Sequence, residues 1–503
     1  MKLTLPPSVK NWLSLAGVII VLTSLFMIVF LFIVSSLLSE QAAYLGLVTY
    51  ILLPAVMILG LLFIPIGMFL ELRRVRRGGV HSPVGWPKID LEKPRHRNAF
   101  FIFVAGTGFF VLFSAVGSYE AFRYTESTNF CGMLCHTVME PEYTAHSHSS
   151  HAQVACAACH VGPGADWYVR SKLSGLYQAY ATVADIYPRP IPTPIKNLRP
   201  ARAVCEQCHW PQKFYGHKLQ VSTHYLSDRD NTPWRIGLNL KVGPSQAALG
   251  LSEGIHWHSN PRTRIDYIAT DPGRQQLSWV RYTNLDSGKV QVFRDKSLTV
   301  AVGSPPRGEL RTMDCIDCHN RPSHLYRAPA QFISTAMTAG RIPVELPEIK
   351  KLAVQVSSRP YPSAVAAREG IRAGITQFYR LNYPDLLAHK QELVEKAVTG
   401  VQDGFAQNIF PEMKVSWQAY PDNIGHLYFK GCFRCHNDNL VSEKGATISQ
   451  DCVLCHDIAI QGTPGKGMEV ARTGESLVFR HPEDVGDAWQ DTPCSDCHSG
   501  VSP

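Results

Sequence analysis

A short motif recurs seven times in this chain: a cysteine, two or three residues, a second cysteine and then directly a histidine. The seven copies use all 14 cysteines and are called motifs 1 to 7 in chain order. Their residues are Cys131, Cys135 and His136; Cys156, Cys159 and His160; Cys205, Cys208 and His209; Cys315, Cys318 and His319; Cys432, Cys435 and His436; Cys452, Cys455 and His456; and Cys494, Cys497 and His498. This pattern attaches c-type haem, because both sulfurs form thioethers and the histidine binds the iron. The sequence therefore predicts seven covalently bound haems.

Zinc sites and disulfides are the ordinary alternatives for so many cysteines. Structural zinc takes four ligands, so pairs of cysteines come in twos, whereas seven is odd. Neither alternative requires a histidine after every second cysteine, and histidine is only 20 of the 503 residues. Haem attachment is therefore the favoured interpretation. Motif 1 departs from the rule, because three residues separate its cysteines where the other motifs have two.

The first 117 residues are very apolar and predict a membrane anchor with three transmembrane helices. The spans are Trp12 to Leu38, Tyr44 to Leu70, and Ala99 to Gly117, each close to the ~20 apolar residues that cross a bilayer. The first is too long for a signal peptide and lacks a small-residue cleavage site. Pro54 and Pro65 fall in the second span and are expected to be tolerated in a helix bundle.

Charge predicts the orientation of these spans. The segment between the second and third spans holds eight basic residues against three acids. These basic residues are Arg73, Arg74, Arg76, Arg77, Lys88, Lys93, Arg95 and Arg97. Basic loops stay in the cytoplasm, so everything after Gly117 is expected in the periplasm of a bacterium, outside the inner membrane. The net charge of +8 is thus largely a topology signal and a possible contact with anionic lipid, not a sign of nucleic-acid binding.

The exported part divides into three predicted segments: 118–330 with four motifs, 331–425 with helices, and 426–503 with three motifs. A small β-rich insert is expected at about 234–300, and Ser363 and Asp385 are expected helix N-caps. The expected strands are Arg235 to Val242, Arg264 to Thr270, Leu277 to Thr283, and Lys289 to Phe293. The predicted fold class is three transmembrane helices plus a periplasmic multihaem domain, mostly α-helical and irregular.

If most haems have two histidine ligands, six or seven irons need a second histidine besides that of the motif. Eleven further histidines lie outside the membrane part. The candidates for ligands are His151, His217, His256, His258, His324, His426 and His481, whereas His389 lies on a predicted helix and is expected to be solvated. His324 follows His319 by only five residues, so it is expected to serve a neighbouring iron. His256 and His258 would share one face if their segment is a strand.

The segment from Cys131 to His160, with His-Thr-Val-Met-Glu-Pro-Glu-Tyr after motif 1 and Ser150-His151 before motif 2, resembles the NapC/NirT/NrfH family of membrane-anchored quinol dehydrogenases. Cys315 to His324 extends the resemblance. Three spans and three extra haems look most like the seven-haem inner-membrane cytochromes of metal-reducing bacteria. The family implies menaquinol oxidation at the first haem and delivery of electrons to periplasmic c-type cytochromes.

The same resemblance points to two residues at a quinol site. In the family a methionine just after motif 1 ligates the first haem, and Met139 lies three residues past His136. Its alternative role is ordinary packing of a flexible thioether. A family lysine follows the second motif, and Lys172 fits this position as a donor to a quinone oxygen or a proton acceptor. Its alternative role is that of an interfacial lysine whose ammonium reaches water.

Two function classes compete on this sequence. The first is a quinol-oxidising electron conduit, alone or as a subunit of a larger membrane complex. The second is a terminal multihaem reductase of nitrite, hydroxylamine or a sulfur oxyanion, which needs an open iron. All seven motifs end in histidine and spare histidines outnumber the vacant iron faces, so the conduit is favoured.

Overall fold

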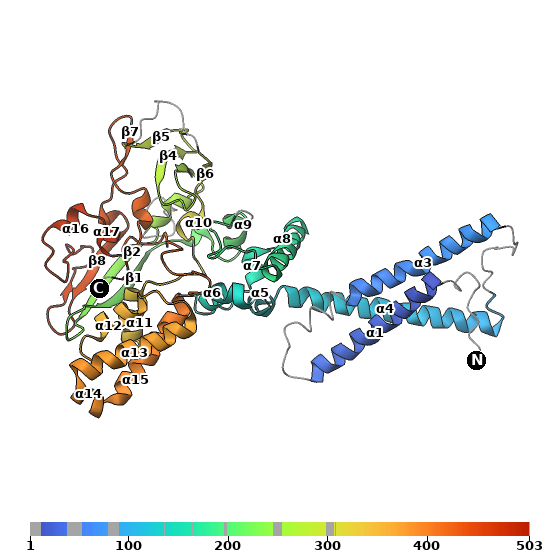
Figure 1. Ribbon diagram of the computed structural model, residues 1–503. Helices are drawn as coiled ribbons and strands as arrows, with labels where there is room; N and C mark the ends of the chain where they lie inside the picture. The colour runs from blue at the N-terminus through green and yellow to red at the C-terminus, as the bar shows by residue number, and fades with distance from the viewer. Residues whose placement is uncertain are drawn as a thin grey trace. The chain divides into compact units, whose positions relative to one another are not determined.

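The computed structural model describes residues 12–37, 53–78, 90–134, 136–162, 165–195, 199–244, 254–297, 306 and 308–501. Contacts within the chain divide it into two units (Figure 1). The first comprises residues 1–136 and 155–157, and the second comprises residues 137–154 and 158–503.

The first unit is helical: α1 (Trp12–Leu37), α3 (Leu53–Gly78), α4 (Pro94–Thr125) and α5 (Thr128–Met133). Among the described residues, two stretches are long and apolar enough to cross a membrane, Trp12–Leu31 and Leu53–Arg74. They agree with the first two predicted spans, although residues 44–52 of the second lie outside the described residues. The third predicted span lies within α4, a helix of 32 residues, and its crossing of the membrane stays a prediction.

Helices α1 and α3 pack through small residues. A Cβ added to Gly17 would stand 2.6 Å from the carbonyl oxygen of Gly60, so the two backbones approach as closely as glycine allows. The Ser14 hydroxyl, fully buried, donates to the carbonyl oxygen of Ile64 at 3.0 Å. Such a bond satisfies a polar group where water is absent.

Two antiparallel sheets organise the second unit. The first has the strand order β1 (His217–Tyr225), β2 (Pro233–Lys241), β8 (His456–Gly462), β9 (Glu469–Val470). The second has the order β6 (Leu310–Thr312), β3 (Thr263–Ala269), β4 (Leu277–Asn284), β5 (Val290–Asp295), β7 (Leu440–Ser442). The four expected strands are confirmed as β2 to β5 within two residues at each end. They do not form a sheet by themselves, because β7, β8 and β9 come from beyond residue 426.

Five helices form the main apolar core of the second unit: α11 (Pro329–Thr338), α12 (Ile349–Ser357), α13 (Ala364–Asn382), α14 (Pro384–His389) and α15 (Gln391–Asn408). They gather on one side of the unit, drawn in orange (Figure 1). Ser363 is confirmed as an N-cap, since its hydroxyl accepts from the amide of Ala366 at 3.1 Å. The N-cap expected at Asp385 is wrong. Pro384 begins α14, which leaves Asp385 inside the first turn.

Candidate functional site

The cysteine motifs are single turns of helix. In motifs 3, 4, 5 and 7 the histidine amide donates to the carbonyl oxygen of the first cysteine, at 2.8 to 3.1 Å. Short helices or 3-10 turns cover the motifs, namely α7 (Cys156–His160), α9 (Ala201–Cys205), α10 (Cys315–Cys318), η6 (Gly431–Arg434), η7 (Cys452–Leu454) and α17 (Cys494–Cys497). One helical turn places residues i and i+4 on one side of the backbone. Each α-helical turn therefore presents its first sulfur and its imidazole in the same direction.

Six of the seven motif histidines face a second histidine from elsewhere in the chain. The centroid separations are 6.1 Å for His160 and His324, 6.0 Å for His209 and His151, 6.2 Å for His319 and His256, 6.0 Å for His436 and His258, 6.2 Å for His456 and His426, and 6.0 Å for His498 and His481. Iron–nitrogen bonds of about 2 Å on opposite faces of one haem would hold two imidazole centroids roughly 6 Å apart. The pairs therefore fit the group that the motifs predict.

Burial favours the ligand form of these imidazoles. It lowers the pKa of the side chains of His160, His256, His258, His319, His426, His456 and His498 below the ordinary value. A lowered pKa keeps the ring neutral at neutral pH, and only a neutral ring has a lone pair for iron.

One short 3-10 helix, η5 (Ile255–Ser259), places a histidine opposite the histidine of each of two motifs. His256 faces His319 of motif 4, and His258 faces His436 of motif 5. The segment is not a strand, so the condition under which these two histidines would share one face is not met. In a helix of three residues per turn, side chains two positions apart point in different directions, so each reaches a different motif.

The structure places His324 opposite His160 of motif 2 and not opposite His319 of motif 4, which precedes it by five residues. This agrees with the expectation that His324 serves a neighbouring motif. His324 also lies 6.3 Å from His146. The Nε2 of His146 is 2.9 Å from the carbonyl oxygen of Val154, so a backbone group already occupies that nitrogen. His160 is therefore the better match for His324.

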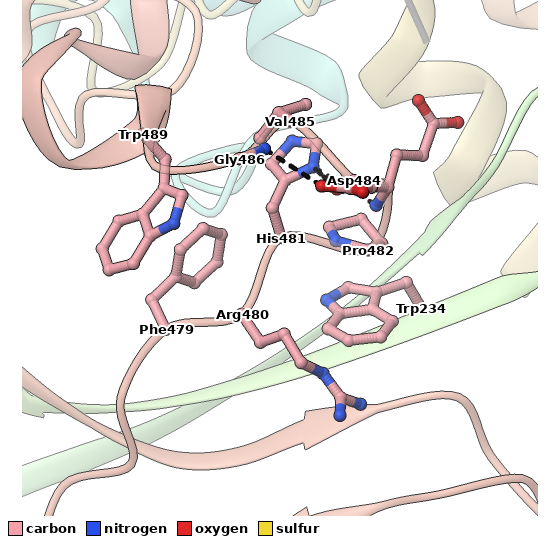
Figure 2. A pocket seen from close by; sticks show the side chains of 10 residues that line it. Trp234, Phe479, Arg480, His481, Pro482, Asp484, Val485, Gly486 and Trp489 are labelled. Atoms are coloured by element: carbon pink, nitrogen blue, oxygen red, sulfur yellow. Dashed lines mark hydrogen bonds between the residues drawn. The ribbon is translucent and has the colours of Figure 1, made fainter.

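A pocket adjoins His481, the partner of motif 7 (Figure 2). The rings of Phe479 and Trp489 lie on one side of His481 and the ring of Trp234 on the other. Arg480 lies over Trp234 at 5.6 Å and pairs with Glu469 at 3.0 Å. Two acids, Glu483 and Asp484, also line this pocket. Its aromatic walls, rather than its charge, suit a flat apolar group.

Consecutive motifs are neighbours in space from motif 2 to motif 7. The sulfurs of Cys205 and Cys315 are close enough to interact, which makes motifs 3 and 4 neighbours. The other neighbouring sulfurs are close enough to interact electrostatically. These pairs are Cys159 with Cys205, Cys318 with Cys432, Cys455 with Cys432 and Cys452, and Cys494 with Cys452. The six motifs thus form one unbroken series.

Spacer residues fasten motifs 4 and 5 to each other and to the second sheet. Arg434, in the spacer of motif 5, donates to the carbonyl oxygen of Asp317, in the spacer of motif 4, at 2.6 Å. The Asp317 carboxylate accepts from the hydroxyl of Tyr267 on β3 at 2.6 Å and from Arg311 at 2.7 Å. Burial and the Asp317 charge raise the pKa of Tyr267 beyond its usual range, so this hydroxyl keeps its proton. Sequence reasoning missed Asp317 and Arg434 because spacer positions carry no consensus.

A carboxylate lies beside the distal histidine of motif 2. Oε2 of Glu142 on α6 (His136–Ser147) is 3.0 Å from Nδ1 of His324, and the carbonyl oxygen of Glu142 is 3.1 Å from the same nitrogen. Burial raises the pKa of Glu142, but His324, Arg321 and Tyr326 together hold it below its ordinary value. No sequence signal could have found this contact, since 182 residues separate Glu142 from His324.

Of the seven candidate ligands, His217 is the one that the described part of the chain does not bring to a motif histidine. His217 lies exposed on β1, and its Nδ1 is 3.2 Å from the side-chain amide nitrogen of Asn239. The structure therefore gives no partner motif for this predicted ligand. His389 is exposed on α14, where its Nδ1 lies 2.8 Å from the carbonyl oxygen of Asp385. His224 is half-buried on β1. Burial, Lys350 and His498 lower its pKa to about 4.

Motif 1 and the predicted quinol residues are placed less completely. Cys135 and the side chain of His136 lie outside the described residues. Met139 is half-buried on α6, about one turn beyond His136. Lys172 is half-buried on α8 (Ala165–Val183).

Helix α8 carries an exposed apolar stripe. Leu173, Leu176, Tyr177, Tyr180 and Val183 are 63 to 89 % exposed. Their spacing of three or four residues puts them on one face of the helix. Two of the five are tyrosines, a residue type enriched where a membrane meets water. This face therefore has the composition of a surface that contacts lipid or another apolar molecule.

Comparison with known proteins agrees with this chemistry. The model of the NapC/NirT cytochrome c family, N-terminal region, matches residues 93–190. The chain is 41% identical over 493 residues to cytochrome c-type protein ImcH of Geobacter sulfurreducens, covering 98% of this chain and 96% of that protein. No solved structure matches the chain. The chain therefore belongs to the NapC/NirT cytochrome c family and is a membrane-anchored electron-transfer protein with covalently bound c-type haem.

Proposed function

We propose that the protein oxidises menaquinol at the outer face of a bacterial inner membrane and passes the electrons through seven c-type haems to periplasmic cytochromes. The observation that carries this proposal is the series of six histidine pairs, each separated by 6.0 to 6.2 Å, along neighbouring motifs. In this proposal the 14 cysteines hold seven haems, and each pair binds both faces of one iron. When bound, the haems supply the one-electron redox chemistry.

Pairing of this kind favours a conduit over a terminal reductase. A reductase must leave one iron face open to its substrate. In motifs 2 to 7 a second histidine stands opposite each motif histidine, so the chain itself fills both axial positions. Motif 1 is the one place left for an atypical ligand, and we assign Met139 to it.

Quinol oxidation releases two electrons and two protons. We assign Lys172 to the quinol site, where its ammonium would donate to a quinone oxygen, or its neutral amine would accept a quinol proton. The exposed stripe of α8 supports this assignment, because the same helix offers an apolar face to a lipid-soluble substrate. The two protons leave to the periplasm, and the two electrons go one at a time into the haem series.

The proposed topology has three membrane crossings, with Ala99–Gly117 of α4 as the third and the haem region in the periplasm. The basic segment before α4 would then lie in the cytoplasm, beside anionic lipid. A reporter fused after Gly117 that proved active only in the cytoplasm would contradict this topology.

The test is stopped-flow reduction of the purified holoprotein by a menaquinol analogue. We expect Lys172→Ala to slow reduction about tenfold or more, a loss of roughly 1.4 kcal/mol of transition-state stabilisation. Arg170→Ala, on the same helix, is the matched control and should react at nearly the normal rate. If no quinol reduced the normal protein, the proposal would fail. Turnover of nitrite would favour a reductase instead.

A further inference from the structure

The Nδ1 atoms of the paired histidines have different partners. Nδ1 lies 2.7 to 2.9 Å from a backbone carbonyl oxygen in His256, His258, His436 and His481. Nδ1 of His151 is 3.3 Å from the carbonyl oxygen of Pro322. The buried Nδ1 atoms of His426 and His456 have no hydrogen-bond partner among the described residues. Of the paired histidines whose Nδ1 contacts are described, His324 is the one whose Nδ1 lies within 3.0 Å of a carboxylate oxygen. Asp457 acts on His456 through its charge alone.

The contact between Glu142 and His324 combines a hydrogen bond with a charge. The carbonyl oxygen of Glu142 accepts the hydrogen bond of Nδ1 at 3.1 Å. Oε2 of the same residue is 3.0 Å from Nδ1 but makes no hydrogen bond of good geometry. The carboxylate therefore acts on the imidazole mainly through its negative charge, at close range in a buried setting.

That charge is not cancelled by a direct cationic partner. Arg321 is the nearest candidate, and its guanidinium lies over the ring of Tyr420, 3.8 Å from the centroid. Within the described residues no ion pair joins Arg321 to Glu142. Arg321 thus acts on the carboxylate from farther away than His324 does.

A negative charge next to an axial histidine makes the ring a stronger donor to its metal. It also favours the oxidised haem, which carries one more positive charge than the reduced haem. We infer that Glu142 is a positioning residue that holds the reduction potential of the motif 2 haem below the value that the same two histidines would give beside a neutral partner. This inference rests on the proposed pairing of His160 with His324.

The test is a redox titration of the holoprotein followed by electron paramagnetic resonance. Glu142→Gln keeps the size and the backbone bond to Nδ1 but removes the charge. We expect it to shift the reduction equilibrium of one low-spin haem about tenfold towards the reduced form, about 59 mV for a one-electron couple. Glu142→Asp retains the charge and should restore most of the normal potential. Glu140→Gln, exposed on the same helix, is the matched control and should shift none.

A separate variant tests the pairing itself. His324→Gly should convert one haem from low spin to high spin, because its iron loses a ligand. If that conversion occurs but Glu142→Gln leaves every potential unchanged, the inference is overturned and the proposed function stands. If His324→Gly leaves all haems low spin, the pairing within the proposed function is wrong, and the role of Glu142 is rejected with it.

Discussion

The second unit contains two regions that are built on different principles. Helices α11 to α15 enclose an apolar core in which residues such as Ile333, Ile371 and Ile375 are fully buried. Beside some of the cysteine motifs, large apolar side chains are exposed. Trp210, next to His209, is 57 % exposed, and Leu454, in the spacer of motif 6, is 48 % exposed. The helical region buries its apolar surface against itself, whereas the motif regions leave theirs for a flat apolar partner to cover.

The difference explains why the motif regions are irregular. A regular element is stabilised mostly by packing of its apolar face. The motif segments instead have cysteines and histidines at positions set by haem attachment, so they have fewer apolar residues for such a face. Covalent haem then adds to small apolar clusters, such as the one of buried residues on β3, β4 and β7 against which Cys435 packs. The helical region needs no such partner. It can support the series of motifs, since the amide of Ala330 on α11 donates a hydrogen bond to the carbonyl oxygen of Gly500, next to motif 7.

The strongest challenge to this contrast is to produce the chain without haem. We expect the motif regions to stay unfolded and to be cut by protease about a hundredfold faster than in the holoprotein, which corresponds to roughly 3 kcal/mol of local stability. A fragment near residues 329–408 should survive, because its core is complete without haem. Limited proteolysis with mass spectrometry measures both the cleavage rate of the motif regions and the survival of the helical fragment. Equal protection of the two regions in the haem-free chain would contradict the contrast.

A single core substitution should harm the helical region alone. Ile375→Ala on α13 removes a fully buried side chain and should lower the free energy of unfolding of this region by about 2 to 5 kcal/mol. Leu381→Ala on the same helix is the matched control, since Leu381 is 70 % exposed. Denaturation followed by far-ultraviolet circular dichroism measures the loss, while the haem absorption spectrum should stay unchanged. A changed spectrum would mean that the two regions share one core.

A buried lysine sharpens the contrast through pH. Lys350 on α12 is 1 % exposed, and its ammonium donates to Ser334 at 2.8 Å. Burial lowers its pKa to about 7. Between pH 7 and the ordinary lysine value of about 10.4 the unfolded chain binds more protons than the folded chain, so stability should rise with pH. We expect a gain of about 1 to 3 kcal/mol from pH 7 to pH 9.

Lys350→Met should abolish that gain, because methionine has a similar length and no charge. Guanidinium denaturation of both proteins at the two pH values measures the difference. Equal stability of the normal protein at pH 7 and pH 9 would contradict burial of an uncompensated charge. It would indicate an acidic group beside Lys350.

The two regions also differ in how far the sequence reveals them. The helices α11 to α15 and the strands β2 to β5 follow from local periodicity, which any single segment displays. Strand β8 escaped prediction because it begins at His456, a motif residue, and pairs with β2 more than 200 residues earlier. The motifs themselves could be predicted, since attachment chemistry fixes their spacing. Which histidine faces each motif histidine could not be predicted, because the pairing depends on contacts between distant segments, as His217 and His256 illustrate.

The smallest expected effect concerns one polar bond that fastens a motif to a sheet. Tyr267→Phe removes the hydroxyl that donates to Asp317 at 2.6 Å. Arg311 still donates to the carboxylate at 2.7 Å, so the loss should be about 1 to 2 kcal/mol rather than the larger value of an unpaired buried charge. Amide hydrogen exchange, measured by mass spectrometry, should become faster in β3 and α10 and stay unchanged in α13. The result bears on the contrast, because motif regions held by separate polar bonds should respond locally. If exchange also quickened across α11 to α15, the two regions would have to be treated as one cooperative unit.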